Sequence, residues 1–108
     1  MPSTTLPRGN VLVTYVLDVP LTPVAVLANI TAEQSFTIQG LQVGDFVSMN
    51  AEDAAQTAGI GIVNVRVSAA NTLTVSFSNS TSGTLTPTAT DYFISIDRPE
   101  GPPPANLV

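Results

Sequence analysis

The chain has 108 residues, a length typical of one compact domain. It carries a formal net charge of −5, only 10% of its residues are charged, and it contains no cysteine, histidine or lysine. These absences exclude disulfide frameworks, thiolate and histidine catalysis, cysteine-ligated zinc and lysine Schiff-base chemistry. Three basic residues on an acidic chain are too few to neutralise a phosphate backbone, so we expect no nucleic-acid partner.

Small hydroxyl residues and β-branched residues take the place of the missing charge. The chain has 14 threonines, 9 serines and 13 valines, a mixture that favours pleated sheet over helix. The longest apolar stretches are far shorter than the ~20 residues of a membrane-spanning helix, and prolines separate them. The composition therefore predicts a soluble all-β protein without a membrane partner.

The first half of the chain begins with an extended N-terminal arm, residues 1–10, which is rich in proline and glycine. Apolar or alternating runs then predict short strands, of which the first is ended by Asp18 and Pro20 and the third by Gly40. One short helix is predicted over residues 50–59, with Asn50 as its N-cap and with Glu52 and Asp53 in its first turn. The strands predicted in this half are Val11–Leu17, Val24–Leu27, Ser35–Gln39 and Val43–Met49.

The second half of the chain alternates more strongly between apolar and polar residues. Runs at 60–68 and 72–78 flank Ala69-Ala70-Asn71 and predict a β-hairpin, in which Gly61, Val63, Val65 and Val67 would share one face. Further strands are predicted at 84–86 and 92–96. Seven or eight short strands in residues 11–98 predict a single β-sandwich or jelly-roll-like barrel.

Residues 99–108 form a proline-rich C-terminal tail. The run Pro102-Pro103-Pro104 favours polyproline II, which has no internal hydrogen bonds, and the tail ends in two apolar residues. Two interpretations stay open for the tail and for the N-terminal arm. Each is either frayed or becomes ordered against neighbouring subunits.

Apparent chemical motifs in the sequence are weak. Gly59-Ile60-Gly61 contains part of a dinucleotide-binding fingerprint, but it opens a predicted strand and the third glycine is missing, so a strand start or a bulge is the better interpretation. Glu52 and Asp53 are adjacent, which points their side chains apart and suits a helix N-terminus better than acid–base catalysis. The other aspartates do not follow the spacing of a calcium loop. No catalytic, cofactor-binding or metal site is predicted, and we expect no enzyme.

The sheet edges of a chain with so few charges are expected to be covered by another surface. Open sheets protect their edges with lysine, inward-pointing charge or proline, and this chain has no lysine and few charges of any kind. A charge-poor β domain left alone tends to stick to copies of itself. Threonine and serine keep the surface wettable without the desolvation cost of charges at an interface. We therefore expect permanent assembly, with copies of the chain or with a larger scaffold.

Two long segments of the chain resemble a family of virion proteins. Residues 31–50 contain Gly40-Leu41-Gln42-Val43-Gly44-Asp45, and residues 58–79 begin with Ala58-Gly59-Ile60-Gly61-Ile62-Val63. Together with residues 84–96, these segments are similar to small all-β head decoration, or cement, proteins of bacteriophages. The resemblance covers about two thirds of the chain. It implies binding to the outer shell of an assembled capsid, at its symmetry axes or between capsomers.

The predicted function is that of a non-enzymatic virion protein on the capsid exterior, without a cofactor. Its expected partners are the major capsid protein and copies of itself, as a dimer or trimer. The alternative is a phage fibre component or an adhesin-like carbohydrate-binding module, although two tyrosines, four phenylalanines and no tryptophan make a poor platform for sugar stacking. Two arginines are candidate partners for acidic capsid surface, and the last two residues are a candidate apolar plug. The full set of candidate capsid or subunit contacts is Leu6, Arg8, Arg98, Pro102, Pro103, Leu107 and Val108.

Overall fold

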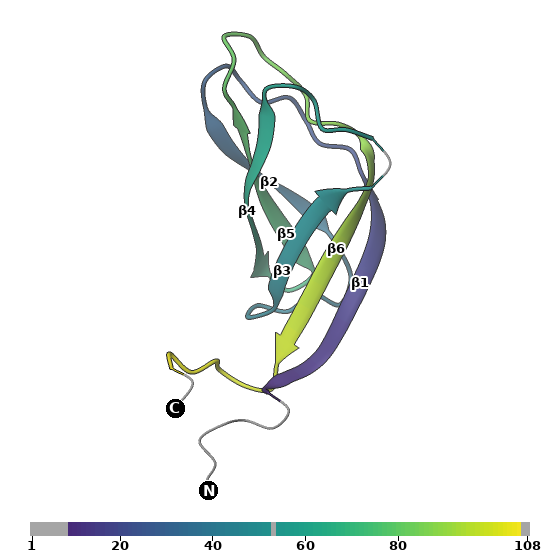
Figure 1. The fold of residues 1–108 in the computed structure, drawn as a ribbon, viewed down its shortest axis with the longest axis vertical. Helices are drawn as coiled ribbons and strands as arrows, with labels where there is room; N and C mark the ends of the chain where they lie inside the picture. The colour runs from purple at the N-terminus through teal and green to yellow at the C-terminus, as the bar shows by residue number, and fades with distance from the viewer. Residues whose placement is uncertain (1–8, 53, 107–108) are drawn as a thin grey trace, which may run out of the picture.

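Two three-stranded antiparallel sheets make up the fold in the computed structural model, which describes residues 9–52 and 54–106 (Figure 1). One sheet has the strand order β1–β6–β3 and the other has the order β2–β5–β4. The all-β prediction is confirmed, and the two sheets pack together as in a sandwich. The strands are β1 (Val11–Leu21), β2 (Thr31–Thr37), β3 (Phe46–Ala51), β4 (Ile60–Ala69), β5 (Thr72–Asn79) and β6 (Thr90–Pro99).

The predicted number of strands was wrong. The described residues form six strands, and the two sheets they make do not close into a barrel. The predicted strands at 24–27 and 84–86 are reduced to one antiparallel bridge between Val26 and Leu85, whose backbone hydrogen bonds are 2.7 and 3.1 Å long. A proline lies within three residues of each bridge partner. Because proline lacks an N–H donor, neither segment can extend its pairing far.

The helix predicted over residues 50–59 was also wrong, since the described residues of this segment contain no helix. Strand β3 continues through Ala51, which pairs with β6, and the next N–H, that of Glu52, donates to the Asp91 carbonyl at 3.0 Å. The Asn50 side-chain amide donates to the Ala51 carbonyl instead of accepting from a helical N–H. Sheet pairing has therefore taken the backbone groups that the first helical turn would have used.

The β4–β5 hairpin is confirmed, but the single face predicted for the alternating residues of β4 was wrong at one point. Asn71 in the turn adopts a left-handed conformation with φ 61°. A bulge between Ile62 and Asn64 places one extra residue in β4, so the alternation shifts there. Ile62 packs against the core while Val63, predicted to share a face with Val65 and Val67, is 57% exposed.

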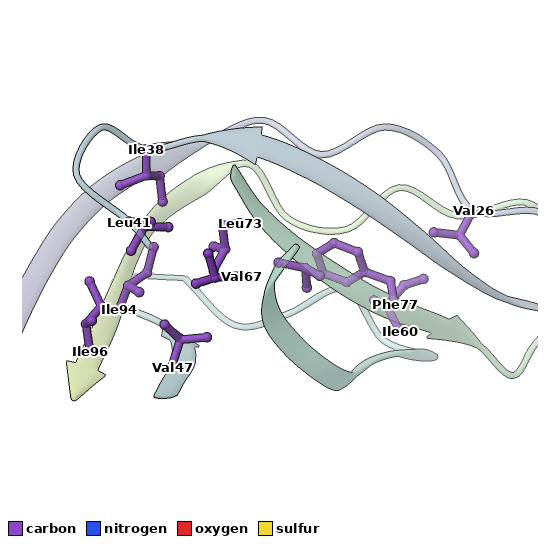
Figure 2. Close-up of a cluster of buried hydrophobic side chains, with 11 residues drawn as sticks. Val26, Ile38, Leu41, Val47, Ile60, Val67, Leu73, Phe77, Ile94 and Ile96 are labelled. Atoms are coloured by element: carbon purple, nitrogen blue, oxygen red, sulfur yellow. The ribbon is translucent and has the colours of Figure 1, made fainter. Parts of the chain in front are cut away.

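The hydrophobic core lies between the two sheets (Figure 2). The central strands β5 and β6 supply its most deeply buried side chains at alternating positions, as a sheet with one buried face requires. These central side chains are Leu73, Val75 and Phe77 of β5 and Tyr92, Ile94 and Ile96 of β6. The surrounding strands and loops add Val26, Ile38, Leu41, Val47, Ile60 and Val67.

The described chain enters and leaves the sandwich at the same end. Val11 at the start of β1 pairs with Pro99 at the end of β6, and the Glu100 N–H extends this contact to the Asn10 carbonyl at 2.8 Å. The tail beyond Pro99 then runs away from the sheets (Figure 1). Sheet pairing thus runs from residue 11 to residue 99.

Candidate functional site

The outer face of the β2–β5–β4 sheet is polar and internally hydrogen-bonded. Thr74, at the centre of β5, is 4% exposed, and its hydroxyl lies 3.1 Å from Ser35 Oγ on β2 and 2.7 Å from Ser68 Oγ on β4. Beside this row, the Arg66 guanidinium donates to both carboxylate oxygens of Glu33 at 3.0 Å, and this hydrogen bonding lowers the pKa of Glu33. We call this surface the hydroxyl face. Its polar groups are engaged with one another, so it is wettable without being reactive.

The outer face of the β1–β6–β3 sheet carries large apolar side chains instead. Ile94 and Ile96 of β6 point into the core, so the residues that alternate with them point outward. Among the outward residues, Val16 of β1 is 68% exposed, Phe46 of β3 is 67% exposed and Phe93 of β6 is 39% exposed. We call this surface the β6 face, and its residues are Thr14, Val16, Asp18, Phe46, Ser48, Asn50, Phe93, Ser95 and Asp97.

Polar groups are interleaved with the apolar ones on the β6 face. The strand register places Phe93 between Asp18 of β1 and Asn50 of β3. Further along the sheet, the Thr14 hydroxyl donates to the Asp97 carboxylate at 2.9 Å. Aromatic side chains among hydrogen-bonding groups are typical of surfaces that bind another protein.

Three carboxylates meet at one end of the β6 face. Asp18, Glu52 and Asp91 offer oxygen atoms that lie within 4.8 Å of one another. They come from β1, from the segment after β3 and from the start of β6, so their spacing in the sequence carried no signal. Carboxylate oxygens suit Ca²⁺, which takes about six to eight oxygen ligands, so these three residues would supply only part of such a shell. Together, the three carboxylates give this end of the β6 face a negative electrostatic potential.

A groove of about 440 Å³ lies where the loop 39–42 faces β1 and β6. Tyr15, Leu17 and Ile96 form its apolar wall, and Arg98 supplies its charge. The Arg98 guanidinium lies 5.9 Å from the centre of the Tyr15 ring and is also bonded to Asp45. The lining residues include no carboxylate beside this cation, so they do not form a general acid–base pair.

The structure describes three of the residues predicted to make capsid or subunit contacts. The Arg98 side chain is only 18% exposed, and its charge is paired within the chain. Pro102 and Pro103 are exposed and, with Arg98 and residues 42–45, line a shallow hollow of about 280 Å³. The other predicted contact residues lie outside the described part of the chain: Leu6, Arg8, Leu107 and Val108.

Sequence reasoning missed the β6 face, although one signal could have pointed to it. Phe46 alternates with buried Val47, and Phe93 alternates with buried Tyr92 and Ile94. Both phenylalanines therefore fall on the side of a strand where solvent-facing residues are expected. Phenylalanines at such positions indicate a sheet face that is more apolar than a solvated face ordinarily is.

Comparison with known proteins adds no family to this description. No protein-family model, curated protein or solved structure matches the chain. Within the described residues, no helix has the length and apolar character needed to cross a membrane.

Proposed function

We propose that this chain is a non-enzymatic structural protein of a phage virion, which binds the outside of the assembled capsid through its β6 face and stabilises the capsid. The observation that carries the proposal is the exposure of Val16, Phe46 and Phe93 together on one sheet face. Exposed apolar side chains on one face, interleaved with polar groups, mark interaction surfaces. The resemblance of residues 31–50 and 58–79 to head decoration proteins supports a capsid as the partner.

The mechanism is additive burial of apolar surface. Covering one large apolar side chain contributes about 1.5–3 kcal/mol, from which the loss of translational and rotational freedom on binding must be subtracted. Each copy therefore holds the capsid with modest strength. A ligand that binds only the assembled lattice stabilises that lattice by mass action, and many copies act in parallel.

The charge of the β6 face restricts which capsid surface it fits. Asp18 and Asp97 lie on the face, and the carboxylates of Glu52 and Asp91 lie at its end. An acidic counterpart would repel these groups, so the complementary surface is apolar with neutral or basic groups at its rim. Where the groups at that rim are basic, association slows as salt screens the charges.

The experiment compares Phe46→Ser with Leu27→Ser. Leu27 is similarly exposed, at 63%, but lies in the segment between β1 and β2 and not on the β6 face, so it controls for general loss of surface apolarity. Each variant is added back to phage capsids from which the protein has been stripped or whose copy of the gene has been deleted, and binding is measured by co-sedimentation. We expect Phe46→Ser to weaken binding roughly tenfold or more and to lower the temperature at which DNA is released, with Leu27→Ser close to wild type. Equal binding by both variants would contradict the proposal.

One observation favours carbohydrate binding as a second candidate function. The Phe93 ring lies between Asp18 and Asn50, and a ring flanked by hydrogen-bonding groups is an arrangement that sugars can stack on. In this case Phe93→Ala would abolish attachment of particles to host cells or to isolated host polysaccharide. The capsids would keep their heat resistance, which distinguishes adhesion from capsid stabilisation.

A further inference from the structure

We propose that two copies of this chain pair edge to edge through β1, in antiparallel orientation, with Val16 facing the same residue of the second copy across a two-fold axis. The two β1–β6–β3 sheets would then form one continuous six-stranded sheet. This assignment names the surface through which copies associate. It does not depend on the capsid proposal, because the isolated chain would show it.

The four edge strands of the two sheets differ in how well they are protected against pairing. β4 is interrupted by register shifts at two places, and such bulges blunt an edge. β2 has seven residues, and its Gln34 side chain closes onto the backbone of Val24, accepting from the N–H at 2.9 Å and donating to the carbonyl at 2.7 Å. β3 has six residues and packs beside β4. Three of the four edges are therefore short, interrupted or covered.

The edge of β1 has none of these protections along most of its length. It is the longest strand, at 11 residues, and it pairs with β6 in an uninterrupted register from Val13 to Leu21. Among the described strands, no other pairs with its outer edge (Figure 1). Its first interruption by proline comes at Pro20, and its one charged residue is Asp18. The backbone N–H and C=O groups that point away from β6 over residues 13–19 are thus a ready template for another strand.

The strand that fits this template is β1 of a second copy. Residues directly opposite each other in an antiparallel pair lie on the same face of the sheet. With Val16 on the axis, Thr14 lies opposite Asp18 of the second copy, Tyr15 opposite Leu17 and Val13 opposite Val19. Every apolar side chain then meets an apolar one, and the hydroxyl meets the carboxylate. The β1 sequence is complementary to itself in this register.

The neighbouring arrangements fit less well. A register centred on Tyr15 sets Asp18 against Leu12 and Thr14 against Val16, which places polar groups against apolar ones. A register centred on Thr14 extends into the bulge between Val11 and Val13. A parallel pair would bring the two Asp18 carboxylates side by side, and like charges across a sheet destabilise it. These comparisons favour the antiparallel pair centred on Val16.

The decisive experiment uses the absence of cysteine from the chain, so that each variant carries a single thiol. Directly opposed residues of an antiparallel pair have Cα atoms about 4.5–5.5 Å apart, within the range that a disulfide spans. We expect Val16→Cys to form a disulfide-linked dimer under mild oxidation roughly tenfold faster than Val43→Cys. Val43 is the matched control because it is 69% exposed, against 68% for Val16, and lies in a loop. The proposal is overturned if Val16→Cys cross-links at the rate of Val43→Cys, or if its faster cross-linking is unchanged when the oxidation is carried out in denaturant.

A second experiment tests the β1 contact without introducing a cysteine. Val16→Lys places two ammonium groups opposite each other at the axis, whereas Val43→Lys adds the same charge elsewhere. We expect the dimer dissociation constant, measured by sedimentation equilibrium, to rise roughly tenfold or more for Val16→Lys only, with circular dichroism unchanged in both variants. A wild-type chain that stays monomeric at the highest soluble concentration contradicts the pairing. Because Phe46 lies on β3 at the opposite edge of the same sheet, Phe46→Ser tests capsid binding without touching this contact, and the two proposals can fail independently.

Discussion

Arg98 and Asp45 lie 53 residues apart in the chain and form a two-pronged ion pair, in which the Nε and Nη2 atoms of Arg98 each donate to one carboxylate oxygen of Asp45 at 2.9 Å. The same Nη2 atom donates to the Gly40 carbonyl at 2.8 Å, and the Asp45 carboxylate also accepts the Gln42 N–H at 3.0 Å. The Asp45 side chain is 2% exposed. This pair therefore fastens the loop before β3 to the end of β6.

Removing the carboxylate of this pair should destabilise the fold. Asp45→Ala leaves the Arg98 guanidinium without its partner and frees the loop. We expect a loss on the order of 1–2 kcal/mol in the free energy of unfolding, less than for a fully buried pair because Arg98 still reaches solvent. Urea unfolding at pH 7 measures it. The matched control is Glu33→Ala, which breaks the half-exposed pair with Arg66 and should change stability little; equal losses in the two variants would show that the burial of Asp45 does not matter.

The same pair predicts how stability depends on pH. The hydrogen bond from Arg98 holds the pKa of Asp45 below its ordinary value of 3.8 in the folded chain. A carboxyl group whose pKa is lowered by folding stabilises the fold above its unfolded pKa, and this contribution is lost as the pH falls through the folded pKa. The stability difference between wild type and Asp45→Asn should therefore be largest near neutral pH and shrink in acid below pH ~4. Unfolding curves recorded between pH 7 and pH 3 that stay parallel for the two proteins would contradict this.

Asn79 is the polar centre of the turn that follows β5. Its Nδ2 atom donates to the carbonyls of Val26 and Gly83 at 3.0 and 2.8 Å, and its Oδ1 atom accepts from the Thr81 N–H and hydroxyl at 2.9 and 2.7 Å. The residue is 2% exposed. Asn79→Ala leaves these groups unsatisfied, so we expect a loss of about 2–3 kcal/mol, measured as a fall in melting temperature. Ser82→Ala, in the exposed part of the same turn, is the control and should melt close to wild type.

Gly59 is required at the start of β4 for two separable reasons. Its φ is +89°, and a Cβ at this position would collide with Thr81 Cγ2. Gly44 has a similar φ of +101° but open space around it, so Gly44→Ala isolates the backbone strain. We expect Gly59→Ala to destabilise by roughly 1 kcal/mol more than Gly44→Ala.

The collision itself can be tested by removing its other partner. Thr81→Ser deletes the Cγ2 atom and keeps the hydroxyl that bonds to Asn79. The double variant Gly59→Ala/Thr81→Ser should recover part of the stability lost by Gly59→Ala, as seen in thermal unfolding monitored by circular dichroism. Additive losses from the two substitutions would show that the methyl contact is not the cause.

The sequence predicted the elements whose pattern is local. Strands β5 and β6 alternate cleanly between buried apolar residues and others, and the turn at Asn71 joins two such runs, so the hairpin and both central strands were foreseen. The predictions failed where pairing with a strand that is distant in the sequence overrides the local residue pattern. The segment 50–59 was predicted as a helix because Asn50 could cap it and acidic residues would lie in its first turn, but pairing with β6 carries β3 through Ala51.

The candidate site was harder to predict because it depends on which strands become neighbours. Val16, Phe46 and Phe93 come from three strands that are far apart in sequence, and only the order β1–β6–β3 brings them onto one face. The bulge that turns Val63 outward is likewise invisible in a pattern of alternating residues. Arg98 was predicted to contact a partner, and the structure pairs its charge with Asp45. No local pattern predicts this pair, because only the folding of the loop before β3 brings Asp45 to Arg98.

The hydroxyl face has a consequence for what can bind to the second sheet. The Thr74 hydroxyl is 4% exposed and already lies within hydrogen-bond distance of Ser35 Oγ and Ser68 Oγ. The Glu33 and Arg66 charges are likewise paired with each other. A polar partner would have to break hydrogen bonds made within the sheet before it could form its own, so binding to this face would be weak.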